Sequence, residues 1–431
     1  MTAERTLFGT DGVRGVVGED MTTTLATQLG RAFALFTGGG EVLIGRDTRA
    51  SGEALTEALA EGIASGGGRA VIGGVLPTAA VALLAPELGA VVSASHNPAE
   101  YNGVKFFGRS GRKLAEADEH AVESLLDADP RPGGSITAAD GLLAQYRAVI
   151  AKRFGTTLAG LRIACDCANG ALSQVAPALL EELGAEVTAV GNSPDGGNIN
   201  AGCGSTELGL LLRTLREGEF DLGVAFDGDG DRLLACDHTA QPVDGDEIVA
   251  ILALHLDVEL VVVTTVTNAG FYELMGQRGI RVVTTDVGDR HVAEALEREG
   301  GVLGGEQSGH IIVRDRQVTG DGLAASLLLG GAVVERGQTL RELAAVMPKW
   351  EQEAGSVAAR TRSLPEALLG EIERLNEVHA GEARVHVRPS GTEPVVRILV
   401  QARERAVALD LYRNAVRLVE SEVGSSQAMP R

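Results

Sequence analysis

The stretch EVLIGRDTRASGEALTEALAEGIASGGGRAVI, at residues 41–72, contains the pattern that predicts the fold. The letters EVLIG predict a strand, the letters GEALTEALAEGIA predict a helix, and the letters RAVI predict a second strand. Leu55, Leu59 and Ile63 recur at every fourth residue, which places them on one apolar stripe of the helix. Ser51 precedes this helix and is expected to be its N-cap. The stretch therefore predicts a βαβ unit.

The same plan recurs twice further along the chain. A second unit begins at residue 161 with LRIACDCANG, and a third begins at residue 260 with LVVVTTVTN. Each of the three units ends in a strand, expected at 90–93, 222–226 and 301–303, that opens into a polar, glycine-rich loop. Ligands of open α/β sheets gather at the carboxyl ends of strands. The loops SASHNP, DGDGDR and GGEQSGH are therefore expected to face one cleft.

The last part of the chain follows a different plan. Helices are expected at 365–375 and 404–420, and strands at 384–388 and 395–401, which is typical of a small α+β domain. The predicted fold class is α/β, with three similar βαβ-type domains and a smaller C-terminal α+β domain around one central cleft. The expected domains are 1–152 with the SASHNP loop, 153–247 with DGDGDR, 248–358 with GGEQSGH, and 359–431 with RPSGTEP.

Composition excludes several classes of protein. The formal net charge of −21 argues against a nucleic-acid binder, because such proteins usually carry a basic excess. An anionic substrate would have to be held by cations gathered locally. The N-terminus MTAERTLFGTDG is polar and no long apolar run occurs, so a cytoplasmic protein with no membrane contact is expected. Since no disulfide or zinc pattern surrounds them, four cysteines are expected to serve packing: Cys165, Cys167, Cys203 and Cys236.

The loop DGDGDR predicts a metal site. Asp227, Asp229 and Asp231 alternate with glycine, so the three carboxylates point to one side of a tight turn. Hard oxygen ligands of this kind suit Mg²⁺. An EF-hand is excluded, because Arg232 stands where that loop needs glycine and His238 where it needs glutamate. The alternative is a solvated acidic turn, which three mutually repelling carboxylates disfavour.

Two other loops offer groups for a phosphorylated sugar. RPSGTEP can wrap an anion with backbone N–H groups and hydroxyls while Arg388 grips it as a fork, with Arg397 on the next strand. An ordinary β-turn explains that loop equally well. GGEQSGH supplies Glu306, Ser308 and His310 at alternating positions, which suits the hydroxyls of a polyol, although a plain turn is an equal alternative.

Two glycine-rich segments nearer the N-terminus carry arginine and aspartate. Arg14, in GTDGVRG, is able to reach an active site from its loop. In IGRDTRASG, the adjacent Arg46 and Asp47 are expected to form a structural salt bridge that holds their own loop.

Ser95 lies in VSASHNPAEYNGVKFF, at residues 92–107, and three roles are open to it. It is an acyl-forming nucleophile, a phosphate carrier or a helix cap. The nucleophile elbow G-x-S-x-G is absent, and no Gly-Lys pair of a Walker A motif occurs. His96 is adjacent and is expected to point elsewhere. A reactive serine, a Mg²⁺ site, an anion loop and a polyol loop together favour phosphoryl transfer between Ser95 and a sugar phosphate.

Taken in order, SASHNP with NGVKFF, DGDGDR, GEQSGH and RPSGTEP resemble the four signature loops of the α-D-phosphohexomutases. The resemblance extends over nearly the whole chain, from GTDGVRG to RPSGTEP. GEQSGH together with VGDRHV is most similar to the phosphoglucosamine mutase branch of that family. The resemblance implies a heart-shaped molecule of four domains around one cleft.

The resemblance also implies roles for particular residues. Ser95 matches the phosphoserine, and its phosphate completes a Mg²⁺ site with Asp227, Asp229 and Asp231. Lys105 matches a lysine that transfers a proton or stabilises the phosphate. The remaining expected site residues are Arg14 for catalysis, Arg232, Asp289, Arg290, Glu306, Ser308 and His310 for the substrate, and Arg388, Ser390, Gly391, Thr392 and Arg397 for its phosphate.

The implied reaction converts glucosamine 6-phosphate to glucosamine 1-phosphate through glucosamine 1,6-bisphosphate, as a step toward amino-sugar and cell-wall precursors. Its expected partner is a small sugar phosphate, and a kinase or a bisphosphate is expected to phosphorylate Ser95 first. The chain is expected to be a monomer or a homodimer. Three alternatives stay open: a phosphoglucomutase or phosphomannomutase, a Mg²⁺-dependent sugar-phosphate hydrolase, and a non-catalytic sugar-phosphate sensor.

Overall fold

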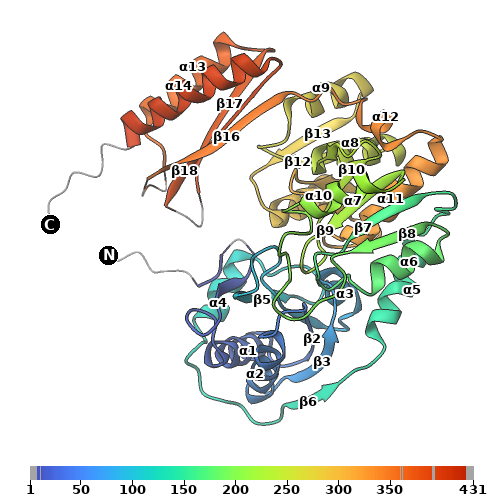
Figure 1. Ribbon diagram of the computed structural model, residues 1–431. Coiled ribbons are helices and arrows are strands. Elements are labelled where there is room, and N and C mark those ends of the chain that lie inside the picture. Colours follow the sequence, from blue (N-terminus) through green and yellow to red (C-terminus); the bar gives the residue numbers. More distant parts are fainter. Residues whose placement is uncertain (1–6, 10, 360, 362, 391–393, 424–431) are drawn as a thin grey trace.

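The computed structural model describes residues 7–9, 11–359, 361, 363–390 and 394–423. Four β-sheets with their helices follow one another along the chain (Figure 1). In that view the first sheet lies at the bottom, the second and third lie at the right, and the C-terminal sheet lies at the upper left. This arrangement confirms the predicted fold class of three similar α/β units and a smaller C-terminal unit.

The first sheet has six strands in the order β1-β5-β4-β2-β3-β6. Its central strands β2, β3 and β4 are parallel, and the expected βαβ unit is present as β2, α2 and β3. The strands are β1 (Val13–Val16), β2 (Glu41–Arg46), β3 (Arg69–Val75), β4 (Leu88–Val92), β5 (Tyr101–Phe107) and β6 (Ser135–Ala138). The helices of this part of the chain are α1 (Thr23–Thr37), α2 (Gly52–Ser65), α3 (Thr78–Leu84), α4 (Glu116–Glu123) and α5 (Leu142–Phe154).

The second and third sheets repeat this plan with fewer strands. Their orders are β11-β10-β9-β7-β8 and β13-β12-β14-β15. The second unit comprises β7 (Arg162–Asp166), α6 (Val175–Glu182), β8 (Glu186–Val190), α7 (Gly209–Glu217), β9 (Leu222–Phe226), β10 (Leu233–Asp237) and β11 (Pro242–Val243). The third comprises α8 (Gly245–His255), β12 (Leu260–Thr264), α9 (Ala269–Arg278), β13 (Arg281–Thr285), α10 (Asp289–Glu299), β14 (Leu303–Gly305), β15 (Ile311–Val313), α11 (Gly322–Arg336) and α12 (Leu340–Ala344).

The C-terminal unit contains one strand that the sequence did not reveal. β16 (Glu351–Ala358) pairs antiparallel with β18 (Val395–Ala402) along its whole length, and β17 (Ala383–Pro389) pairs with the other edge of β18. The expected boundary between residues 358 and 359 therefore lies one strand too late. β16 is a largely exposed edge strand with polar letters EQEAGS, so it lacks the apolar alternation by which a strand is recognised. Figure 1 shows α13 (Glu366–Val378) and α14 (Arg405–Val423) on one face of this sheet.

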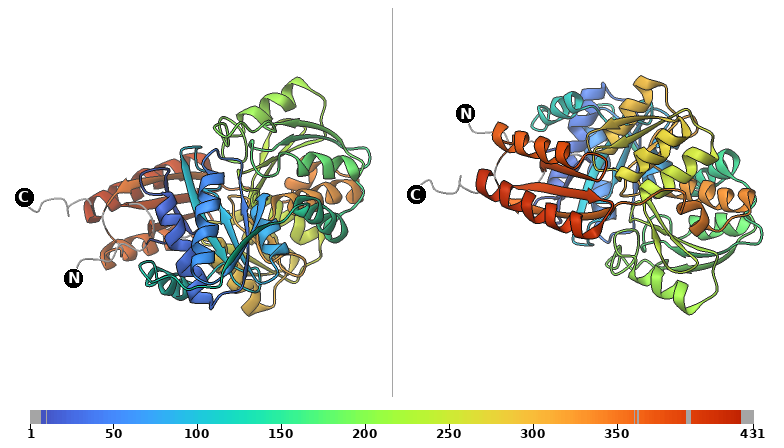
Figure 2. Two further views of the ribbon diagram at one scale, coloured as in Figure 1. Left: turned by 90° about the horizontal axis from the view of Figure 1, so that it is seen from below. Right: turned by 90° about the horizontal axis from the view of Figure 1, so that it is seen from above.

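The hydrophobic cores show which units are joined firmly. One continuous core runs from α3 and α5 through the second sheet and into the third. The first sheet and its helices α1 and α2 enclose a second core, and the C-terminal unit encloses its own. The C-terminal unit extends to one side of the body that the second and third sheets build (Figure 2).

The C-terminal unit is joined to the third unit chiefly through polar groups. Gln401 is buried and donates to the carbonyls of Val266 and Thr267, both at 3.2 Å, while its own carbonyl accepts from the amide of Ala269. Arg384 donates to the carbonyl of Thr265 at 2.9 Å. The position of the C-terminal unit therefore depends on hydrogen bonds more than on shared apolar packing.

One expectation for IGRDTRASG is wrong. Asp47 forms its ion pair with Arg49, at 2.9 Å, and not with Arg46. Ser51 is the N-cap residue of α2, as expected, but its hydroxyl accepts a hydrogen bond from Asn102 and makes no bond to the helix. Asp47 pairs with the residue two positions further on instead of its neighbour, and Ser51 has a partner 51 positions away. Local sequence preferences specify neither partner.

The pair of Asp47 and Arg49 supports the loop that follows β4. Both side chains are fully buried. Arg49 donates to the carbonyls of Ser95, at 2.9 Å, and Asn97, at 2.7 Å, and also to that of Pro98. Ser95 has a φ of +50°, a left-handed conformation that is unfavourable for a side chain with a Cβ. The arginine thus holds Ser95 in a conformation that the isolated chain would avoid.

We predict that Arg49→Ala lowers the free energy of unfolding by about 3–5 kcal/mol, because it leaves the buried Asp47 carboxylate without its cation and the Pro98 carbonyl without its arginine donor, while Asn200 still donates to the carbonyls of Ser95 and Asn97. Urea denaturation followed by circular dichroism measures this change. Arg69→Ala is the matched control, since its guanidinium is about half exposed and its ion pairs at 3.7 and 3.8 Å are worth at most about 1 kcal/mol. Equal losses in the two variants would contradict the role assigned to Arg49.

Candidate active site

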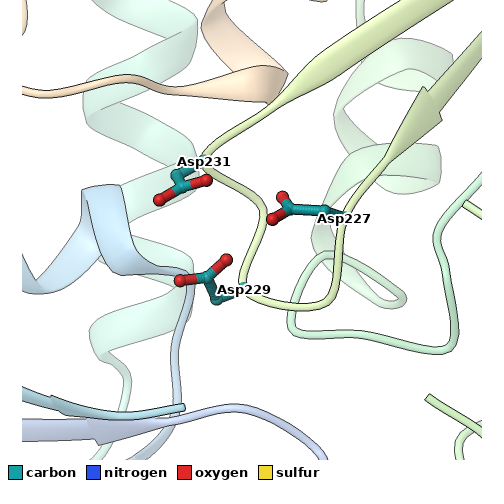
Figure 3. A group of neighbouring side chains, drawn as sticks. All are labelled: Asp227, Asp229 and Asp231. Atoms are coloured by element: carbon teal, nitrogen blue, oxygen red, sulfur yellow. The ribbon is translucent and has the colours of Figure 1, made fainter. Parts of the chain in front are cut away.

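The acidic loop lies between two buried strands of the second sheet. β9 ends at Phe226, the loop turns at Gly230 with a φ of +75°, and β10 returns antiparallel from Leu233. Figure 3 shows the carboxylates of Asp227, Asp229 and Asp231 converging on one space. One ligand oxygen of each lies within 4.8 Å of the others. The predicted side-by-side arrangement of the three aspartates is therefore present.

The serine loop of the first unit meets this acidic loop. The Ser95 hydroxyl donates to Oδ2 of Asp227 at 2.5 Å, across 132 positions of the chain. A Cβ at Gly228 would lie only 2.6 Å from the carbonyl oxygen of Ser95, so the close approach of the two loops requires glycine there. The structure thus brings together the two loops that the sequence suggested for a phosphate carrier and a metal.

Lys105 neutralises part of this acidic cluster. It comes from β5, is fully buried, and places Nζ 2.8 Å from Asp229, 3.4 Å from Asp231 and 2.9 Å from Asp11. Burial by itself would lower the pKa of Lys105, but Asp11, Asp229 and Asp231 together raise it well above its ordinary value. Lys105 therefore stays charged, and one ammonium stands among several carboxylates.

The three aspartates retain capacity for a metal ion. Burial raises the pKa of Asp227 well above its ordinary range, and the adjacent Asp231 and Asp229 carboxylates raise it further. Within the described part of the chain, Oδ1 of Asp229 and Oδ1 of Asp231 are buried and accept no hydrogen bond. Buried carboxylate oxygens without donors are unfavourable, and a hard divalent cation satisfies them. The residues present therefore fit such an ion.

A cavity of about 300 Å³ opens beside the acidic cluster. Asp231 lines it, and residues of the first, third and C-terminal units complete its wall. Glu306 accepts from the amide of Gly288 at 2.9 Å, which joins the GGEQSGH loop to the start of α10. Predicted residues that line this cavity are Asp231, Arg232, Asp289, Glu306, Ser308, His310, Arg388, Ser390 and Arg397.

The C-terminal unit contributes two guanidiniums to the cavity. Arg388 and Arg397 stand directly opposite one another on β17 and β18. Burial lowers the pKa of Arg388 below its ordinary value, and the neighbouring Arg397 lowers it further. Two like charges at a cross-strand position favour an anion between them. Gly391 and Thr392, predicted in the same loop, lie outside the described residues.

Arg290 and Arg14 each form an ion pair with a carboxylate that was not predicted. Arg290 does not line this cavity, because its guanidinium grips Glu119 with both terminal nitrogens and faces a neighbouring cavity. Arg14 forms an ion pair with Asp11, and its Nε is buried without a hydrogen bond. Arg14 therefore lies next to Asp11, which lines the cavity, and its charge also acts on His96 and Lys105.

Several site residues were missed from the sequence. Asp11, in GTDGVRG, and Lys113, in GRKL, both line the cavity, and the Lys113 ammonium lies 2.5 Å from Asp11 and 2.5 Å from Asp289. His96, expected to point elsewhere, has Nδ1 at 3.4 Å from the Ser95 hydroxyl. Burial, with help from Arg232 and other cations, lowers the pKa of His96 to about 4, so the ring is neutral. The sequence signal for Asp11 and Lys113 was a charged residue close to glycine, in GTDG and GRKL.

Models of a known protein family match most of the chain. Models of the phosphoglucomutase/phosphomannomutase family match its alpha/beta/alpha domain I at residues 5–131, domain II at 144–240, domain III at 244–350 and the C-terminal domain at 332–418. The phosphoglucosamine mutase of Alkaliphilus metalliredigens is 42% identical, over 97% of this chain and 99% of that protein. That of Moorella thermoacetica is 44% identical, over 93% of this chain and 96% of that protein.

Solved structures share the fold. A putative phosphomannomutase from Thermus thermophilus aligns with a TM-score of 0.79 and 25% identity, over 96% of this chain and 98% of that one. Aspergillus fumigatus N-acetylphosphoglucosamine mutase, solved with GlcNAc-6P and magnesium, aligns with a TM-score of 0.71 and 19% identity, over 97% and 96%. The chain is similar to phosphoglucosamine mutases along almost its whole length. It belongs to the phosphohexomutases, a family of isomerases.

Proposed function

We propose that this chain interconverts glucosamine 6-phosphate and glucosamine 1-phosphate, with Ser95 as the carrier of the phosphoryl group. The observation that carries the proposal is the hydrogen bond of the Ser95 hydroxyl to Asp227, 2.5 Å away in the acidic loop. Asp231 of the same loop lines a cavity together with Arg388 and Arg397. Similarity to phosphoglucosamine mutases over nearly the full length supports this substrate.

The proposed reaction has two phosphoryl transfers that mirror each other. In the first, the bond between Ser95 Oγ and phosphorus breaks, O1 of glucosamine 6-phosphate bonds to phosphorus, and the O1 proton is transferred, in net terms, to Ser95 Oγ. This yields glucosamine 1,6-bisphosphate, which changes its orientation in the cavity before the second transfer. In the second, Ser95 Oγ bonds to the phosphorus on O6, the bond between O6 and phosphorus breaks, and the proton of Ser95 Oγ is transferred, in net terms, to O6. Glucosamine 1-phosphate is then released, and the enzyme is again phosphorylated.

Charge at the site supports this assignment. A phosphoserine carries about −1.5 to −2 charges, and a substrate phosphate adds a similar amount. Lys105 is held in its charged form, which supports a role in stabilising the phosphate rather than in accepting a proton. Arg232 lies on the cavity wall beside Asp231. In phosphoryl transfer, such electrostatic stabilisation and positioning provide most of the rate enhancement.

We propose Mg²⁺ as the cofactor, held by Asp227, Asp229 and Asp231 together with the phosphate on Ser95. When bound, the ion would neutralise negative charge that develops on the phosphoryl oxygens. The donor set supports this choice, because it consists of carboxylate oxygens alone.

The other phosphate of the substrate is assigned to the C-terminal unit. Arg388, Ser390 and Arg397 line the cavity. We propose that they hold the phosphate that is not reacting, with Gly391 and Thr392 of the same loop. Because the two sugar orientations present different ends to Ser95, this clamp would have to release and regrip between the transfers.

We also propose that a kinase or glucosamine 1,6-bisphosphate first phosphorylates Ser95, and that the chain is a monomer or a homodimer. A cytoplasmic location is also proposed, because all four cysteines are free thiols. No helix of the described residues is long and apolar enough to span a membrane.

We predict that Ser95→Ala lowers turnover of glucosamine 6-phosphate by about 10³-fold or more, because the covalent carrier is lost. Its circular dichroism and melting temperature should stay close to those of the parent protein. Intact mass measurement should find one phosphate on the parent, mapped to the peptide that contains Ser95, and none on the variant. Full activity in Ser95→Ala would remove the phosphoserine from the mechanism.

Removal of divalent metal should stop turnover. We expect excess EDTA to abolish it and added Mg²⁺ to restore it, because the acidic loop then regains the charge that its oxygens require. In calorimetric titrations, Mg²⁺ should bind the parent protein but not Asp229→Asn. The idea fails if EDTA leaves the rate unchanged, or if Asp229→Asn binds Mg²⁺ as tightly as the parent.

Substrate preference separates the proposal from its alternatives. We expect kcat/KM for glucosamine 6-phosphate to exceed that for glucose and mannose 6-phosphates by at least about tenfold, because Glu306 and Asp289 in the cavity favour an ammonium group. Phosphorus-31 NMR measures the products. A preference for glucose or mannose 6-phosphate would favour the alternative mutases, and steady release of inorganic phosphate would favour a hydrolase.

A further inference from the structure

A second cavity, of about 560 Å³, lies outside the candidate site and is rich in arginine. Three segments far apart in the sequence form its wall with the end of α3. They are the turn after β5, the end of α5, and the loop between β15 and α11. Its charged residues are four arginines and one aspartate: Arg109, Arg153, Arg314, Arg316 and Asp315. In a chain of net charge −21, this gathering of like charge is unexpected.

The cavity's arginines are oriented mostly by neutral groups. Arg153 donates to the carbonyl of Arg316 at 2.5 Å, and Arg316 donates back to the carbonyl of Arg153 at 3.4 Å. Arg314 donates to the carbonyl of Gly301 at 3.1 Å. The guanidinium of Arg316 also lies over the ring of Phe154, 5.9 Å from its centre. These contacts hold the guanidiniums in place without neutralising their charge.

Few carboxylates compensate the cluster. Arg109 lies 3.4 Å from Glu87, and Arg316 lies 3.8 Å from Asp315, both at exposed positions. Across the described ranges, Arg153 and Arg314 form no ion pair within 4 Å. Guanidiniums that share one cavity repel one another, and a multivalent anion removes that repulsion while it forms forked hydrogen bonds.

The wall of this cavity is firmly built. A Cβ at Gly111 would lie 2.3 Å from the carbonyl oxygen of Ala82, so the turn after β5 is packed directly on α3. Gly111 has a φ of +71°, which favours glycine as well. Ala82, Leu83 and Val318 add apolar surface beside the arginines. The cavity therefore offers a charged part for phosphates and an apolar part for an organic group.

We propose that this cavity is a second anion site, and that its ligand carries a diphosphate group. One phosphate would not balance three or more guanidiniums, whereas two linked phosphates carry a charge of similar size. Inorganic pyrophosphate and a nucleoside diphosphate share this chemistry. The site goes beyond the proposed reaction, which uses a sugar monophosphate in a different cavity.

The cavity also adjoins the candidate site through both of its loops. The turn with Arg109 leads within a few residues to Lys113, whose ammonium lies between Asp11 and Asp289. The loop with Arg314 leads to Gly320, whose amide donates to Nε2 of His310 at 3.1 Å. A ligand in the arginine cavity would therefore tie the first unit to the third, next to residues that line the other cavity.

Calorimetric titration of the full chain with inorganic pyrophosphate tests this site. The titration uses EDTA and the background variant Arg388→Ala, so that neither a metal nor the pair of Arg388 and Arg397 accounts for the binding. We expect about one pyrophosphate per chain. The added double substitution Arg153→Gln and Arg314→Gln should weaken binding at least tenfold. Arg147→Gln, an exposed arginine on the same helix α5, should change it less than twofold.

Two further arms complete the experiment. Tighter binding of ADP than of pyrophosphate would identify a nucleotide as the ligand, and equal or weaker binding would identify the free diphosphate. The proposal is overturned if neither ligand binds the Arg388→Ala chain, or if the double substitution leaves the affinity unchanged. Arg109→Gln, at a two-thirds exposed position, gives an independent check should the double variant fold poorly. Turnover of glucosamine 6-phosphate is measured separately, so failure of the proposed reaction is distinguished from failure of this site.

Discussion

The contact between the serine loop of the first unit and the acidic loop of the second is the constraint on which the site depends. Ser95 reaches Asp227, and Lys105 from the neighbouring strand β5 reaches Asp229 and Asp231. Burial of either the lysine or the carboxylates alone would be unfavourable, because a buried charge requires an opposite charge nearby. The two units are therefore specified relative to one another by charge as well as by the continuous core beneath them.

The distribution of charge reconciles an acidic protein with an anionic substrate. A net charge of −21 repels phosphates at long range, but that repulsion is screened within about 8–10 Å in physiological salt. Inside the cavity, short-range contacts determine whether a phosphate binds. Its lining includes four cations: Arg232, Arg388, Arg397 and Lys113. Asp11 and Asp289 hold Lys113 in place from two different units. Recognition of phosphate is thus a local property of this protein.

The C-terminal unit is attached differently from the rest. Its core is separate, and its junction with the third unit consists largely of the hydrogen bonds of Gln401 and Arg384. A junction of this kind fixes a position while it leaves little apolar surface to be exposed by a rotation. This is consistent with a clamp, formed by Arg388 and Arg397, that must regrip its ligand between two half-reactions.

The sequence by itself determined the elements and the chemical content of the site. Period-four apolar residues in α2, the buried strand before DGDGDR and the glycines within that loop are local signals, and the structure bears them out. Local signals failed for β16, because a polar edge strand is recognised only by its partner β18. The same signals predicted that Asp47 pairs with Arg46 and that Arg290 binds the substrate. In the structure Asp47 pairs with Arg49, and Arg290 pairs with Glu119.

Tertiary structure alone decided which charges meet. Asp11, Lys113 and Asp289 come from two units and are joined only when those units pack, and the contact between Ser95 and Asp227 spans 132 positions. Hydrophobic periodicity specifies which face of an element is buried, but it says nothing about which distant side chain lies opposite. The sequence therefore names the groups able to bind a metal and a phosphate, and packing sets the distances that make them one site.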